Sequence, residues 1–382
     1  MNILFVHEIE WRRDPVWELH TLSELLSLRG HNVYAVDYGA THYQEADIAR
    51  VYPSAKVHLI RPPSFGLGRL MYGVIYNYVI YTILKSRKID VVILYSAPTN
   101  GIQTILATKR LGIPIVFRSI DVLHKLVAKP LALPTKMAER WVYRHVDKIL
   151  TITPALSRYV IKLGANHAKI RMLPLGITLN PPPDALSAIR NVLWGKTWGK
   201  YHTMVFAGTL PHFSGLDDLI SRMPEIVTCI PNLKLLIVGD GAQRPKLERM
   251  IAELCLEERV KITGMVPHED VPKWIAGADI GVLTFPAEGA TRDIFPTKVL
   301  QYMACGKPVV ANPLPGLVDY SLGREQGVVY AWNDDWASAI EKALGNKAVL
   351  GGLARRYVEQ EHGYDRIMSR LERELEALCE SH

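Results

Sequence analysis

The sequence predicts an α/β protein with two doubly wound parallel sheets. Short apolar runs rich in Val and Ile alternate with segments of helical period along most of the chain. Continuous apolar runs are typical of strands that helices cover on both faces. The alternation stops once, at the three successive prolines of residues 181–183, and then restarts. A length of 382 residues also suits two domains.

The first half contains strand-length apolar runs and an amphipathic helix after the first of them. In residues 19–28 the side chains of Leu22, Leu25 and Leu26 recur at helical spacing, which makes one face apolar. Because the runs alternate with helical segments, we expect a parallel sheet with crossover helices. The predicted strands are residues 3–6, 33–36, 57–60, 91–95, 115–117 and 149–152.

Residues 175–199 interrupt this rhythm. Proline lacks an amide N–H, so successive prolines fit neither a helix interior nor a central strand. We therefore expect a linker over residues 181–200, between an N-terminal domain of residues 1–180 and a C-terminal domain of residues 201–355. Residues 356–382 are expected to form a C-terminal helix that packs back on the N-terminal domain.

The second half repeats the alternation of strands and helices. The predicted strands are residues 204–206, 235–238, 260–262, 280–283, 309–311 and 328–330. Helices are expected near residues 216–223, 243–256, 270–276 and 298–304, and over the charged amphipathic tail, residues 355–380, with a break at His362 and Gly363. Ligands of such sheets bind beyond the carboxyl ends of the strands.

Composition excludes several classes of protein. With 48% hydrophobic and 22% charged residues, the chain is globular rather than disordered. The four cysteines form no Cys-x-x-Cys pair, which favours reduced thiols in a cytosolic protein over a disulfide or metal framework. Charges follow the first apolar run closely, unlike a signal peptide, and the apolar residues 71–84 are too short to span a bilayer.

The positive charge is concentrated in one part of the chain. The net charge is +7, but residues 51–200 hold 22 Lys and Arg against 5 Asp and Glu. This excess is either a solvated surface or a sign of an anionic partner. No RNA-binding motif accompanies it, so we expect no nucleic acid partner.

Two basic clusters lie beside apolar residues, as at an anionic membrane surface. The residues of the first cluster lie on both sides of the aromatic residues 72–81, and these aromatic residues could equally belong to a buried helix. The first cluster is Arg61, Arg69, Lys85, Arg87 and Lys88, and the second is Lys125, Lys129, Lys136, Arg140 and Arg144.

The clearest chemical signal lies in residues 292–310. Pro296, Thr297 and Lys298 should open a helix, with Thr297 as its cap and Lys298 in its first turn, and Gly306 should end it. A helix N-terminus at the carboxyl end of a strand favours anions, and a lysine there adds a full charge. The alternative is an ordinary capped helix with a surface lysine.

Three loops that follow predicted strands could contact a nucleotide. The small residues of the first loop let backbone N–H groups approach a phosphate. The second loop offers a tight turn, and the backbone groups of the third could contact a nucleobase. Each loop could also be an ordinary connection, with Arg244 and Lys246 as solvated helix residues. The candidates are Gly208, Thr209, Ser214 and Gly215 in the first loop, Asp240 in the second, and Gly264 and Val266 in the third.

The order of these motifs resembles the donor-binding half of retaining glycosyltransferases of family 4, which have the GT-B fold. The matching stretches are FAGTLPHFSGLDDL, LLIVGDGAQRPKLE, VKITGMVPHEDVPKWIAGADIGVLTF and FPTKVLQYMACGKPVVA. The first half agrees more loosely, through NILFVHEIE and LSELLSLRGHNVYAV. The resemblance implies two Rossmann-like domains facing across a cleft, with the acceptor in the first and a nucleotide sugar in the second. It also implies retention of anomeric configuration without a metal or cofactor.

The chain departs from the family pattern at its donor site. Where the family has two glutamates separated by seven residues, this chain has Asp293 and Gln301. Thr209 and Ser214 stand where the family has a phosphate-binding Arg and Lys. The resemblance therefore makes Lys298, with Arg292, the candidate replacement for the missing cations.

The first half departs as well. The family's His-Asp pair is here Ile120 and Asp121, so a catalytic-contact histidine is missing, while Asp121 can still touch donor or acceptor. His124 could fold back, although a surface histidine is the simpler interpretation. The expected Gly-rich acceptor loop is residues 8–14, without the usual glycines.

We therefore predict a metal-independent, retaining hexosyltransferase acting on a UDP- or GDP-sugar and a glycan or lipid-linked acceptor, in the cytoplasm or peripherally at the inner membrane face. The alternatives are an epimerase of the same fold or a catalytically impaired nucleotide-sugar binder. Asp293, Lys298 and Asp121 are the predicted catalytic residues. The predicted donor-binding residues are Gly208, Thr209, Ser214, Gly215, Asp240, Gly264, Val266, Arg292, Thr297 and Gln301.

Overall fold

The computed structural model describes the chain except residues 8–9, 13–17, 38–43, 62–67, 180–199, 289–290 and 293–294. The described chain divides into two compact units. One contains Met1–Leu175 with Asp365–His382, and the other Gly176–Tyr364. Apart from Lys200, the predicted linker, residues 181–200, lies outside the described residues.

The first unit is built on an eight-stranded sheet with the order β3-β4-β2-β1-β5-β6-β7-β8. All neighbours are parallel except β3, which runs antiparallel to β4 at one edge. Every strand predicted in this half is present. The strands are β1 Asn2–Val6, β2 Asn32–Val36, β3 Gln44–Ile48, β4 Val57–Arg61, β5 Val91–Leu94, β6 Ile115–Ser119, β7 Lys148–Thr151 and β8 Ile170–Met172.

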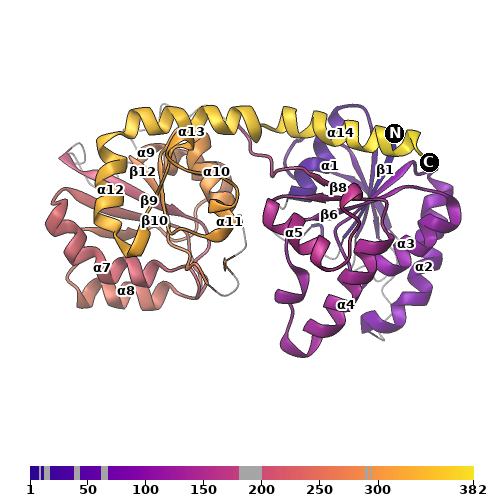
Figure 1. The fold of residues 1–382 in the computed structure, drawn as a ribbon, viewed down its shortest axis with the longest axis horizontal. Helices are drawn as coiled ribbons and strands as arrows, with labels where there is room; N and C mark the ends of the chain where they lie inside the picture. Colours follow the sequence, from indigo (N-terminus) through magenta and orange to yellow (C-terminus); the bar gives the residue numbers. More distant parts are fainter. Residues whose placement is uncertain are drawn as a thin grey trace. The chain divides into compact units, whose positions relative to one another are not determined.

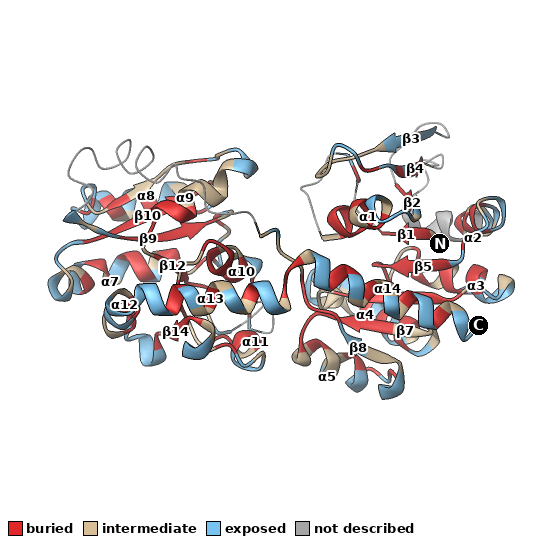
Figure 2. Ribbon diagram, turned by 90° about the horizontal axis from the view of Figure 1, so that it is seen from above, coloured by how far each residue is buried: buried red, intermediate tan, exposed pale blue. Residues whose placement is uncertain are grey.

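Helices cover both faces of this sheet, so the strands are buried between them (Figures 1 and 2). In α2 the side chains of Tyr76, Ile80 and Ile83 join the core cluster of the sheet, so one face of the described part of this helix is buried, as the second predicted alternative expects, while Tyr78 is 71% exposed. The helices are α1 Glu18–Leu28, α2 Gly68–Ser86, α3 Gly101–Leu111, η1 Leu123–Lys125, α4 Lys129–His145, α5 Pro154–Lys162, η2 His167–Lys169 and α14 Tyr364–Glu380. Among the described residues, no helix combines the length and apolarity needed to cross a bilayer.

The second unit is built on a six-stranded, all-parallel sheet with the order β11-β10-β9-β12-β13-β14. These are the strands predicted for this half. They are β9 His202–Ala207, β10 Leu233–Val238, β11 Val260–Ile262, β12 Ile280–Leu283, β13 Val309–Ala311 and β14 Val328–Tyr330. The helices are α7 Leu216–Cys229, α8 Arg244–Glu253, η4 His268–Asp270, α9 Val271–Gly277, α10 Thr297–Ala304, α11 Pro315–Val318, η6 Arg324–Gln326, η7 Trp332–Asp334, α12 Trp336–Gly345 and α13 Lys347–Glu361. The predicted fold class, two doubly wound α/β domains, is confirmed.

The C-terminal tail is shared by the two units. Helix α13 ends at Glu361 and α14 begins at Tyr364, so the break falls at the predicted His362 and Gly363. Helix α14 is held on the first unit by an ion pair between Lys148 Nζ and Glu374 Oε2 at 2.6 Å. A second pair joins Arg29 Nη1 and Glu372 Oε2 at 2.8 Å. The last helix therefore belongs structurally to the unit that contains the N-terminus.

Candidate functional site

The carboxyl edge of the second sheet is the natural place for a ligand, because all six strands end there. The loops after β9, β10 and β11 lie against one another through glycines. A side chain on Gly239 would overlap the Gly208 carbonyl oxygen, and a Cβ on Gly241 would lie 2.6 Å from the Leu210 oxygen. Gly239 and Gly264 form an isolated β-bridge. The glycines therefore serve first to let three loops meet.

Lys298 is a cation at this edge with no carboxylate partner among the described residues. Its Nζ lies 5.2 Å from the ring centre of Phe206 and 5.0 Å from that of Phe285, within cation–π range. Its side chain fills the space beside Gly208, where a Cβ would lie 2.7 Å from Nζ. Burial lowers the pKa of Lys298 to about 8. A partly desolvated ammonium with no carboxylate partner among the described residues gains from binding an anion.

The helix that carries Lys298 begins one residue earlier than predicted. Thr297 is the first helical residue of α10, and Pro296 occupies the cap position without a side-chain cap. The prediction of Thr297 as the cap is therefore wrong, because the chain enters the helix at the extended Pro296. Lys298 does lie in the first turn, and Gly306 has the left-handed backbone expected after the helix end.

The loop after β9 uses its small residues for internal bonds. The Ser214 N–H donates to the Pro211 oxygen at 2.9 Å, and its buried hydroxyl bonds to Gln243. Gly215 has φ +68°, and a side chain there would overlap the Thr284 carbonyl. These two residues therefore hold α7 against the end of β12. Thr209 is exposed, and the Gly208 N–H donates to the Val238 oxygen.

The loops after β10 and β11 form a charged corner. Asp240 accepts from the Gly241 N–H at 2.8 Å and pairs with Arg244 Nη1 at 2.7 Å, and these contacts lower the pKa of its carboxyl. Arg244 lies against Gly264, and Val266 is half-buried. Lys246 pairs with Asp217 at 2.6 Å. Both cations are thus already bound to carboxylates, which favours their interpretation as helix-surface residues.

The remaining predicted donor contacts lie around α10. Gln301 is half-buried, one turn after Lys298 and on the same side of the helix. Arg292 is exposed, and its carbonyl oxygen accepts from the Gly316 N–H at 3.1 Å. Asp293 lies outside the described residues.

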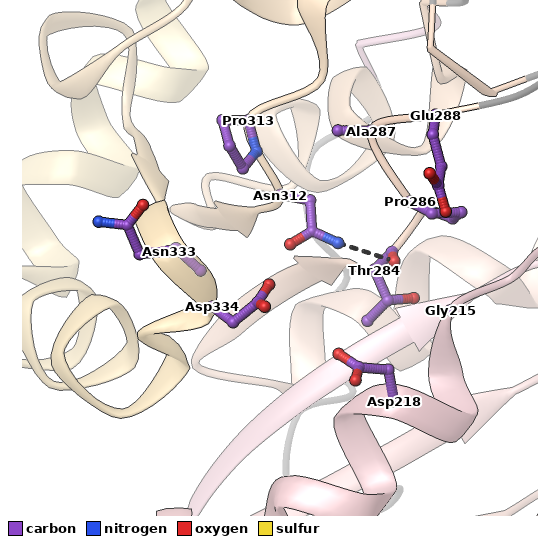
Figure 3. Close-up of a pocket in the computed structure, with 11 residues that line it drawn as sticks. Gly215, Asp218, Thr284, Pro286, Ala287, Glu288, Asn312, Pro313, Asn333 and Asp334 are labelled. Atoms are coloured by element: carbon purple, nitrogen blue, oxygen red, sulfur yellow. Dashed lines mark hydrogen bonds between the residues drawn. The ribbon is translucent and has the colours of Figure 1, made fainter.

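A pocket of about 360 Å³ opens at the same edge, among the ends of β12, β13 and β14. The side chains of Asp218, Asn312 and Asp334 surround its space (Figure 3). Asn312 Nδ2 donates to the Thr284 and Phe285 carbonyls at 3.0 and 3.1 Å, which ties β13 to the loop after β12. Three carboxylates line the pocket, from Asp218, Glu288 and Asp334. Arg222 pairs with Asp218 at 3.1 Å and with Asp334 at 3.2 Å, which leaves the group net negative. This net charge disfavours a diphosphate here and suits hydroxyl groups.

In the first unit, Asp121 and His124 lie in different surroundings. Asp121 is half-buried, and desolvation raises the pKa of its carboxyl. His124 Nδ1 lies 2.9 Å from Glu139 Oε2 and 2.9 Å from the Tyr159 hydroxyl. The fully buried Glu139 also accepts from the Leu123 N–H at 3.0 Å. The surface interpretation of His124 is therefore wrong, because a buried carboxylate anchors the ring.

The predicted acceptor loop is only partly described. Residues 8–9 and 13–14 lie outside the described residues. Trp11 is fully buried, and its backbone N–H donates to Asp37 Oδ1 at 2.9 Å. The Trp11 carbonyl oxygen lies 3.2 Å from His20 Nε2. A buried tryptophan thus anchors this loop in place of a glycine turn.

Several residues of the site carry no local motif. Phe206 and Phe285 are far apart in sequence, and only the fold brings their rings to Lys298. In the sequence, Glu139 cannot be distinguished from other charged residues of a surface helix. Asn312 and Asp334 follow β13 and β14, so their position at the ends of predicted strands was an available signal.

Comparisons with known proteins agree with this arrangement. The family model described as glycosyl transferases group 1 matches residues 201–346, and that of the glycosyl transferase 4-like domain matches residues 16–176. The chain belongs to the group 1 glycosyltransferases.

Its relatives include mannosyltransferases that act on glycolipids. The chain is 31% identical over 233 residues to the GDP-mannose-dependent alpha-(1-6)-phosphatidylinositol monomannoside mannosyltransferase of Mycolicibacterium smegmatis, covering 57% of this chain and 60% of that one. It is 28% identical to the monoacylated counterpart of Corynebacterium glutamicum, covering 62% and 64%. The chain thus spans less than two thirds of the length of these relatives.

Solved structures share the fold. Anabaena Alr3699/HepE, solved in complex with UDP, superposes with a TM-score of 0.76 at 18% identity, covering 99% of this chain and 100% of that one. At this identity the likeness shows the fold, and it agrees with the GT-B architecture implied by the motifs.

Proposed function

We propose that this group 1 glycosyltransferase is a retaining, metal-independent hexosyltransferase that moves a sugar from a nucleoside diphosphate sugar to a lipid-linked or glycan acceptor. The observation that carries the proposal is Lys298, a partly desolvated cation at the carboxyl edge of the second sheet. It is carried by the first turn of α10, where the helix dipole adds to its charge.

The diphosphate is assigned to Lys298 and the space beside Gly208. The absence of a side chain at Gly208 leaves room for Lys298, and Phe206 and Phe285 hold the ammonium in place. An ammonium stabilises the charge that develops on a departing diphosphate, which is the role that we assign to it here without a metal. Gln301, one turn further along α10, is assigned to the ribose hydroxyls through its amide.

The reaction that we infer is a front-face displacement. The acceptor hydroxyl oxygen forms a bond to the anomeric carbon as the bond from that carbon to the diphosphate oxygen breaks. The acceptor approaches on the face of the sugar that the departing diphosphate occupies, so the configuration is retained. The hydroxyl proton passes to the departing phosphate oxygen, so no further base is needed. Positioning and electrostatic stabilisation supply most of the acceleration.

Two carboxylates are assigned to the sugar or the acceptor. Asp293, at the position of the family's first glutamate, is assigned to donor-sugar hydroxyls, and Asp121 to the donor or the acceptor. Replacing Asp293 by alanine should reduce turnover while leaving thermal unfolding unchanged. Full activity in that variant would remove Asp293 from the mechanism.

A UDP- or GDP-sugar is the expected donor. The two relatives described above are named for GDP-mannose and for phosphatidylinositol mannosides, and the Anabaena structure contains UDP. A lipid-linked acceptor and an anionic membrane surface at the inner face of the membrane fit the basic excess of residues 51–200.

The test is to incubate the full chain with UDP-, GDP-, ADP- and dTDP-sugars and membrane lipid extract, with a chelator present, and to follow sugar transfer and nucleoside diphosphate release. We expect one donor to transfer sugar with retained configuration. Isomerisation of the donor without transfer would instead indicate the epimerase. Binding without turnover would indicate a nucleotide-sugar-binding protein. Activity that disappears with the chelator would contradict metal independence.

A further inference from the structure

Helix α4 and the turn before it expose large apolar side chains to solvent. Leu126, Leu131, Leu133 and Met137 are 63%, 57%, 68% and 65% exposed, although they lie within twelve residues of one another. The opposite side of α4 is already packed, through Thr135, Ala138 and Val142. Apolar residues on both sides of a surface helix indicate a contact that the folded unit does not itself provide.

The same stretch is strongly basic. Lys125, Lys129, Lys136 and Arg140 are exposed, and residues 122–138 contain no Asp or Glu. Glu139, the next acidic residue, is buried and engaged by His124 and Tyr159. Its carboxylate therefore does not neutralise the exposed cations of this stretch. In the described part of the chain, no carboxylate pairs with Lys129, Lys136 or Arg140.

The other basic cluster differs from this one. Arg61 pairs with Asp37 at 2.9 Å and Arg87 pairs with Glu45, so two of its cations are already neutralised. Of the described aromatic residues that it brackets, Tyr76 is buried in the core and Tyr78 is 71% exposed. Among the described residues, the α4 stretch therefore combines Lys129, Lys136 and Arg140, which have no carboxylate partner, with several exposed aliphatic side chains.

We propose that the α4 face, defined as residues 125–140, docks on an anionic lipid bilayer. Leu131, Leu133 and Met137 enter the boundary between head groups and acyl chains, while Lys129, Lys136 and Arg140 contact lipid phosphates. The match of charge and apolar area favours lipid over nucleic acid, which offers phosphates but no apolar layer. This inference deepens the membrane part of the proposed function and rests on it.

The experiment is flotation of the full chain with vesicles of phosphatidylcholine, with and without phosphatidylglycerol, at low and high salt. We expect binding only to the anionic vesicles, and release at high salt. Replacing Lys129, Lys136 and Arg140 by glutamine should weaken binding about fivefold per cation. Replacing Leu131, Leu133 and Met137 by serine should weaken it by at least about tenfold. The matched control, Lys342→Gln with Val349→Ser in the second unit, should bind like the wild type.

Three results would overturn the proposal. One is unchanged vesicle binding in both triple variants, and another is an equal loss in the control. The third is concentration-dependent self-association, measured by sedimentation, that both triple variants abolish, because a second copy would then occupy the face. Calorimetry with UDP and GDP on the same proteins separates the two ideas. Vesicle binding without nucleotide binding would support the α4 face and contradict the proposed donor. Nucleotide binding without vesicle binding would contradict the α4 face alone.

Discussion

The assignment of Lys298 to the diphosphate makes nucleotide affinity depend on pH in a calculable way. In the free protein burial lowers the pKa of Lys298 to about 8, and a bound diphosphate restores the charged form. At pH 7 about nine in ten molecules carry the charge, and at pH 9 about one in ten. If only the charged form binds, affinity falls about tenfold between these values, or about 1.4 kcal/mol.

The assay is calorimetric titration of UDP and GDP across pH 7 to 9 in buffers of different ionisation enthalpy. Above pH 8 each binding event should take up close to one proton. Lys298→Arg is the matched control, because a guanidinium stays charged and its affinity should not follow this titration. The assignment would be refuted if nucleotide affinity changed equally with pH in the wild type and Lys298→Met, or if binding took up no proton above pH 8.

Three further predictions concern the scaffold, each measured by urea unfolding. Gly215→Ala should destabilise the protein by about 2 kcal/mol or more, because its φ is +68° and its Cβ overlaps Thr284, whereas Gly345→Ala, with open space around it, should be neutral or slightly stabilising. Glu139→Gln should cost about 1–3 kcal/mol, because the amide cannot accept all the bonds that the carboxylate does. Asp121→Asn should stabilise the protein at neutral pH, because burial raises the pKa of Asp121 and penalises its charged form. That gain should shrink as pH falls and vanish below the ordinary carboxyl pKa of about 4.

The strands of both sheets could be predicted because most are continuous apolar runs. The two that were missed have other sequences. Strand β3 reads QEADI and pairs only at the sheet edge, antiparallel to β4, so its polar residues carry no apolar signal. Strand β8 is three residues long, with Arg171 and Met172 exposed. Its pairing with β7 comes from the tertiary fold rather than from local pattern.

The site could be predicted as a set of loops but not as a set of contacts. The position of Lys298 in the first turn follows from the Pro-Thr-Lys pattern. Its lowered pKa comes from burial, and the rings of Phe206 and Phe285 that lie beside its ammonium are far apart in sequence. Ser214 was predicted as a phosphate contact because it is small. Only the fold reveals that Gln243 takes its hydroxyl.

The most direct test of the account is a thermal-shift screen of UDP-, GDP-, ADP- and dTDP-sugars on the wild type and on Lys298→Ala. The account predicts that one donor raises the unfolding midpoint of the wild type. It also predicts that Lys298→Ala needs about ten- to a hundredfold more of that donor for the same shift, corresponding to the loss of about 1.5–3 kcal/mol for a charged hydrogen bond. No shift with any donor, or equal shifts in both proteins, would contradict it.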